Sequence, residues 1–70
     1  MSLMDNILRL ILDGKWHDTA EIALALQISP QKVDKIIRLF REFNFIQHEN
    51  FKIRISPDVR KLLVHLEEEL

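Results

Sequence analysis

The sequence contains no cysteine, one glycine and two prolines in 70 residues. Without cysteine the chain can have no disulfide, no thiol nucleophile and no cysteine-ligated zinc or iron–sulfur site. One glycine is too few for the Gly-rich loops that cradle nucleotide phosphates. The longest apolar run, residues 22–26, is about a quarter of a membrane-spanning helix. No basic segment precedes an apolar one as in a secretory signal, so we expect a cytoplasmic protein without membrane contact.

Residue types that carry catalysis are scarce and badly spaced for it. His17, His48 and His65 are far apart and do not form the HxxxH or HExxH spacing of metal ligands. Ser29 and Ser56 each precede a proline, which is typical of helix caps and not of nucleophiles. A core this small also leaves little room for a deep pocket. We therefore expect no enzyme activity, cofactor, metal or small-molecule ligand, and a binding module is the starting expectation.

Hydrophobic residues make up 47% of the chain and charged residues 30%, a composition typical of one folded domain over residues 1–70. Met1, Ser2 and Leu3 directly precede a second methionine, Met4. This pattern is typical of an added leader, with the natural start at Met4. Chains below roughly 70–80 residues that lack disulfides and metals usually need very good packing or a partner.

Apolar spacing and capping residues divide the chain into six segments. Helical periodicity over residues 3–13 ends at Gly14, residues 15–17 form an extended stub, and Asp18 caps a helix through residue 26. A helix over 29–43, a hairpin over 45–55 with its turn at Glu49-Asn50, and a last helix after Ser56-Pro57 follow. The predicted fold is mainly α with a small β-hairpin (α+β), in the order helix, stub, helix, helix, hairpin, helix.

Several short motifs occur along this order: the run Asp18 to Ala23, the turn Ile28-Ser29-Pro30, the apolar residues Val33, Ile36 and Ile37, and Phe45-Ile46 before the hairpin. Over nearly the whole chain they resemble a winged helix-turn-helix domain. Ala23 matches the family's small residue in its first helix, and Ile28 its hydrophobic turn residue. The resemblance implies that fold, and for many members DNA binding in transcription regulation; other members bind RNA or only proteins.

The helix over 29–43 has one apolar face and one polar face. Its apolar residues, Val33, Ile36, Ile37 and Phe40, fall within about 60° on a helical wheel and are expected in the core. In a major groove, the polar face would read bases, since Gln pairs with adenine and Lys or Arg with guanine. The resemblance adds the hairpin as a wing that contacts phosphate or the minor groove. The predicted contacts with duplex DNA are Gln31, Lys32, Lys35, Arg38, Arg41, Asn50, Lys52 and Arg54.

Charge is distributed unevenly, although the chain as a whole has a net charge of −1. Residues 27–56 contain six basic and three acidic residues, whereas the remainder contains four basic and eight acidic residues. A segment of net charge +3 favours attraction to phosphates.

Two alternatives to DNA binding stay open. Arg38 could pair at i,i+4 with Asp34 and Glu42, which would make the helix a merely solvated surface. The near-neutral total charge favours a protein–protein interaction module within a larger assembly.

Aromatic residues are few, and most are expected to be structural. Phe40, Phe43, Phe45 and Phe51 are predicted in the core. The alternative is a stacking platform for single-stranded nucleic acid, which needs exposed rings beside basic residues. Phe51 beside Lys52 is the only such place, and Trp16 is expected to cover the hairpin edge.

The first and last helices have more apolar residues than a single buried face needs. We therefore predict a homodimer. Its candidate contacts are Leu3, Ile7, Leu10, Leu63, Leu66 and Leu70. In the alternative, the last helix folds over the first and covers the excess within one chain.

Overall fold

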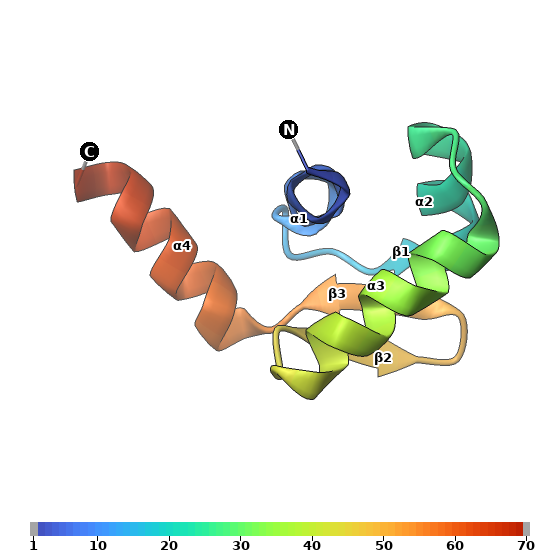
Figure 1. The fold of residues 1–70 in the computed structure, drawn as a ribbon. Helices are drawn as coiled ribbons and strands as arrows, with labels where there is room; N and C mark the ends of the chain where they lie inside the picture. The colour runs from blue at the N-terminus through green and yellow to red at the C-terminus, as the bar shows by residue number, and fades with distance from the viewer. Residues whose placement is uncertain (1, 70) are drawn as a thin grey trace.

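The computed structural model describes residues 2–69, with side chains as far as residue 66. This range contains α1 (Leu3–Ile11), β1 (His17–Asp18), α2 (Thr19–Leu26), α3 (Pro30–Glu42), β2 (Ile46–Glu49), β3 (Lys52–Ile55) and α4 (Pro57–Glu69) (Figure 1). The fold is α+β, mostly helical with a small antiparallel sheet, as the sequence predicts. None of the helices in this range combines the length and apolar character that crossing a membrane requires.

Side-chain caps determine where three of the helices begin. Oxygens of Ser2, Asp18 and Ser29 accept hydrogen bonds from the backbone N–H groups of Asp5, Ala20 and Lys32, at 3.2, 2.8 and 3.3 Å respectively. Each bond satisfies an amide that has no partner inside its helix. Pro30 occupies the first turn of α3, where a missing N–H has no cost. The capping signals at Asp18 and Ser29 therefore act as predicted, whereas the cap at Ser2 was not predicted.

The sheet has the strand order β1-β3-β2, and neighbouring strands are antiparallel. The short extended segment before α2 becomes an edge strand, because His17 pairs with Ile53 and Asp18 pairs with Lys52. The sequence predicts the extended segment but not its pairing with the hairpin. Asp18 both ends β1 and caps α2, so the strand leads directly into the helix.

The hairpin turn lies one residue later than predicted. Glu49 pairs with Lys52, so the two-residue turn is Asn50-Phe51 and not Glu49-Asn50. Asn50 has a φ of 56°, a left-handed conformation that asparagine tolerates better than most residues. The observed register places Ile53 on the buried face of the sheet.

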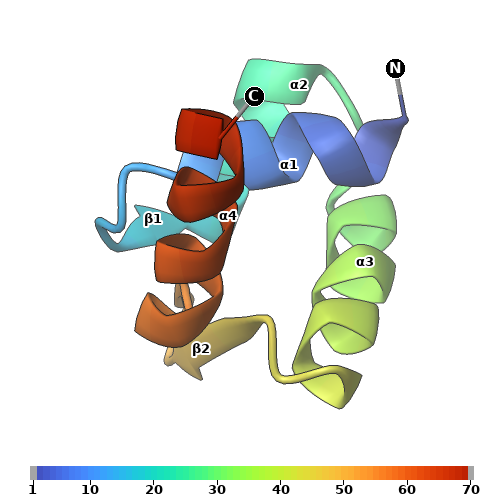
Figure 2. The same ribbon diagram turned by 90° about the vertical axis from the view of Figure 1, so that its left-hand side faces the viewer.

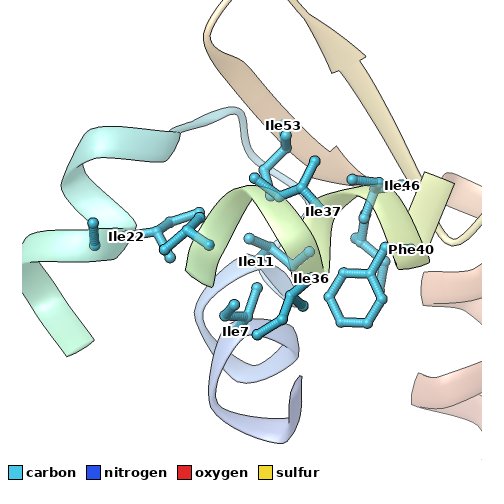
Figure 3. Close-up of a cluster of buried hydrophobic side chains, with 11 residues drawn as sticks. Ile7, Ile11, Ile22, Ile36, Ile37, Phe40, Ile46 and Ile53 are labelled. Atoms are coloured by element: carbon cyan, nitrogen blue, oxygen red, sulfur yellow. The ribbon is translucent and has the colours of Figure 1, made fainter. Parts of the chain in front are cut away.

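One apolar cluster lies between the three N-terminal helices and the inner face of the sheet (Figure 3). Its members are Ile7, Ile11, Ile22, Ala23, Val33, Ile36, Ile37, Phe40, Ile46, Ile53 and Ile55. All four apolar residues predicted on the inner face of α3 belong to it. Isoleucine dominates the cluster, and Phe40 is its one aromatic ring.

The prediction that all four phenylalanines lie in the core is wrong for three of them. Phe40 is fully buried, but Phe43 is 62% exposed, Phe45 36% and Phe51 77%. Phe43 is the C-cap of α3, and Phe51 lies in the hairpin turn, so neither position faces the cluster. Phe45 packs its ring at 6.1 Å from that of Phe40 and 5.7 Å from that of Phe43.

The helices α1 and α4 are covered to different extents. Ile7 is fully buried inside the chain, so its prediction as a dimer contact is wrong. Leu3, Leu10 and Leu63 are partly buried and pack against the core, whereas Leu66 is 50% exposed. Leu70, also predicted as a dimer contact, lies outside the described residues. The broad apolar surface of α1 is therefore used largely within its own chain.

Candidate nucleic-acid interface

The exposed side of α3 carries the largest group of predicted DNA contacts. Val33, Ile36, Ile37 and Phe40 attach the opposite side to the core. Because a helix turns by about 100° per residue, this attachment directs the intervening polar positions outward. Its exposed polar residues are the predicted contacts Gln31, Lys32, Lys35, Arg38 and Arg41, together with the acidic Asp34 and Glu42. The structure therefore brings all five predicted contacts of this helix to its solvent side.

The basic side chains of α3 are not neutralised by neighbouring carboxylates. In the described residues, no ion pair joins Arg38 to Asp34 or to Glu42. The contact between a carboxylate and a histidine that the described residues do contain joins Asp13 to His17, and neither residue belongs to α3. The alternative in which α3 is a surface held together by i,i+4 pairs is thus not what the structure adopts. These cations are available to an outside anion.

The hairpin contributes Lys52, but in a mixed electrostatic setting. Lys52 is exposed and is paired in register with Asp18 on β1 and Glu49 on β2. Directly paired residues on adjacent strands project to the same side of a sheet, so two carboxylates share its face. This arrangement weakens the local attraction of Lys52 for a phosphate.

Arg54 is held by contacts within the protein. Its Nε–H donates a 2.6 Å hydrogen bond to Oε1 of Gln47 on the paired strand β2. Its guanidinium carbon lies 4.7 Å from the centre of the Trp16 ring, a cation–π contact that joins the segment before β1 to β3. Arg54 is only half-exposed. We therefore separate Arg54 from the freely exposed cations Lys35, Arg38 and Lys52.

A hollow beside α3 was not predicted from the sequence. Residues from α2, the start of α3 and the hairpin tip line a groove of about 870 Å³. Leu24 and Phe51 line it and are the most exposed large apolar residues described, at 79% and 77%. Phe51 is also fixed at its backbone, because its carbonyl accepts a 2.9 Å hydrogen bond from Thr19 N–H. A helical wheel of α2 could have placed Leu24 opposite the core residues Ile22 and Ala23.

The predicted contact Asn50 lies at this hairpin tip. Its side chain is exposed, and its backbone is the left-handed residue of the turn. Asn50 also lines the groove together with Phe51 and His48. The hairpin tip therefore presents a polar amide and an aromatic ring side by side, next to the first turns of α3.

A small polar cluster at the end of α1 lies outside this interface. Asp13 Oδ1 accepts a 2.9 Å hydrogen bond from Lys15 N–H and lies 2.8 Å from His17 Nε2. The hydrogen bond to His17 has the largest effect, and together with the bond from Lys15 N–H it holds the pKa of Asp13 below its usual value. The described part of the chain contains no group of three His, Asp or Glu side chains close enough together to hold a metal ion.

Comparison with protein-family models, with curated proteins and with solved structures found no match to this chain.

Proposed function

We propose that this chain is a winged helix-turn-helix domain that binds duplex DNA, as a small transcriptional regulator. In this proposal α3 is the recognition helix and the β2–β3 hairpin is the wing. The observation that carries it is the exposed row of unpaired basic residues on α3, opposite a face that is buried in the core. The order of elements, with a helix pair before a hairpin, agrees with this assignment.

The side chains of α3 divide into two roles in this proposal. Gln31 and Lys32 lie in the first turn, the part of a recognition helix that reaches base edges. Lys35 and Arg38 follow on the same exposed side, where they can contact guanine or phosphate. Lys52 and Asn50 add contacts from the wing. Arg54 supports the wing through Trp16 and Gln47 and is not required to touch DNA.

Fluorescence anisotropy with mixed-sequence duplexes at low salt tests this function. Each phosphate contact contributes about −0.9 to the slope of log K against log salt. The double variant Lys35→Ala/Arg38→Ala should bind more weakly and flatten the slope by up to about 1.8 per protomer. A matched control is Arg9→Ala/Lys15→Ala, which removes the same charge from exposed positions outside α3 and should keep most of the affinity.

Two results would overturn the proposal. One is no binding at high micromolar protein. The other is an equal loss of affinity in the α3 variant and in its control, which would place the nucleic-acid contact elsewhere.

A protein–protein interaction module is the second candidate function. The apolar groove with its exposed Leu24 and Phe51 favours it, since contiguous exposed apolar surface marks interaction sites. The anisotropy experiment separates the two candidates, because a protein-binding module would show no loss specific to Lys35 and Arg38.

A further inference from the structure

Residues in the first half of the last helix, α4, pack against the rest of the chain. Val59 and Leu63 pack against the core, and Arg60 Nε–H donates a 2.8 Å hydrogen bond to the carbonyl of Leu12. Beyond these contacts α4 leads away from the sheet (Figures 1 and 2).

Beside Val59 and Leu63, the same apolar face of α4 continues into an exposed flank. Leu62 is 61% exposed and Leu66 is 50% exposed. They are one turn apart, so they lie on the same face of the helix. The sequence also allowed the alternative that the last helix covers the excess apolar surface within one chain, and in the structure Leu62 and Leu66 stay exposed.

The charges along α4 indicate what covers this face. Its first half contains Arg60 and Lys61 with one acid, Asp58, whereas residues 67–69 are three glutamates. The C-terminal end of a helix is also the negative end of its dipole. A parallel copy of α4 would place acidic ends together. An antiparallel copy places each acidic end beside the basic, dipole-positive end of the other.

We infer that a second copy of this chain binds here, through antiparallel pairing of the two α4 helices, so that Leu62 of each copy contacts Leu66 of the other. The contact is two-fold symmetric, and its axis crosses the helix pair midway between the levels of Leu62 and Leu66. Such a self-complementary patch closes as a dimer. The inference does not rest on the proposed DNA binding, because α3 and α4 lie on different sides of the molecule (Figures 1 and 2).

Sedimentation velocity of the DNA-free protein over a range of micromolar concentrations tests the pairing. We expect a monomer–dimer equilibrium, and the variant Leu62→Gln/Leu66→Gln should raise its dissociation constant by at least about tenfold, since four half-exposed leucines would no longer be buried. Leu39→Gln, which changes an exposed leucine of α3, is the matched control and should dimerise normally. A wild-type monomer throughout, or a dimer that tolerates the double change, would overturn the inference.

Cross-linking of single-cysteine chains tests the orientation, because the natural sequence contains no cysteine that could form a competing disulfide. Chains with Leu62→Cys and with Leu66→Cys are mixed at equal concentration and oxidised. Antiparallel pairing predicts mainly the mixed disulfide, since a disulfide needs Cα atoms within about 7 Å. Faster formation of the two like-with-like disulfides would indicate parallel helices and contradict the proposed geometry.

Discussion

Two cations on the same strand of the hairpin are expected to serve different purposes. Lys52 and Arg54 project from the same side of β3, since side chains alternate along a strand, and their removal changes the charge equally. Arg54 is nevertheless bound to Gln47 and Trp16, whereas Lys52 is exposed. We predict that Arg54→Ala destabilises the fold and that Lys52→Ala does not.

The structure sets the size of this difference. A cation–π contact contributes about 0.5–1 kcal/mol when exposed and about 2 kcal/mol when desolvated. A hydrogen bond adds about 0.5–1.5 kcal/mol net. For half-exposed Arg54 the sum is about 1–2.5 kcal/mol. In a domain of about 60–100 residues each kcal/mol shifts Tm by about 4–8 °C, so Arg54→Ala should lower Tm by about 4–20 °C. Lys52→Ala should change stability by no more than about 0.5 kcal/mol.

Thermal unfolding followed by circular dichroism measures the stability side, and anisotropy at several salt concentrations measures the DNA side. Lys52→Ala should flatten the salt slope by up to about 0.9 per protomer. Arg54→Lys keeps the charge but loses the planar group that lies over Trp16, so it should be destabilised like Arg54→Ala. Equal Tm values for Lys52→Ala and Arg54→Ala would refute the assignment of Arg54 as a structural residue.

Three further predictions concern stability and are measured by urea or thermal unfolding. The pKa of Asp13 is lowered in the folded state, so the wild type should be more stable than Asp13→Asn above about pH 4. This difference should vanish as the pH falls below the folded-state pKa of Asp13. A difference that persists in acid would contradict this prediction. Phe40→Ala should cost about 3–5 kcal/mol, because Phe40 is fully buried, while Phe43→Ala should cost far less. Gln27→Gly should stabilise the chain, by up to about 1 kcal/mol, because Gln27 ends α2 with a φ of 54° that glycine adopts without strain.

The elements of the fold could be predicted because their signals are local. Asp18 and Ser29 act within three residues of themselves, and the apolar spacing of α3 repeats within one helix. The caps and the periodicity therefore determine α2 and α3 without reference to the rest of the chain. The α+β class follows from the same signals.

The predictions from sequence were wrong or incomplete at positions whose environment depends on distant segments of the chain. Phe43 and Phe51 have the side chains of core residues, but the end of α3 and the hairpin turn place them in solvent. Hydrophobicity alone cannot show that a helix has already ended. The pairing of β1 with β3 likewise depends on contact between segments far apart in sequence, and two residues carry too little pattern to predict it.

The candidate site was predictable in part for the same reason. The exposed basic row of α3 follows from its period, and the structure places all five of its residues outward. The sequence also suggested that Arg38 pairs with Asp34 and Glu42, and the absence of those pairs from the described residues depends on side-chain conformation. The cation–π contact between Arg54 and Trp16 forms only when the sheet has assembled. The spacing of residues along the chain could therefore not predict this contact.

The two proposals have a joint consequence for the DNA that this chain would bind. Antiparallel pairing of α4 makes a dimer with a two-fold axis, and the same axis relates its two α3 helices. A two-fold protein matches inverted half-sites, whose separation is close to whole helical turns of the duplex. With a net charge of only +3 on the segment that contains α3 and the hairpin, one copy offers few phosphate contacts. Two copies held in a fixed geometry bind as a unit, since the second contact becomes intramolecular. Loss of α4 pairing would therefore weaken DNA binding even though α4 touches no DNA.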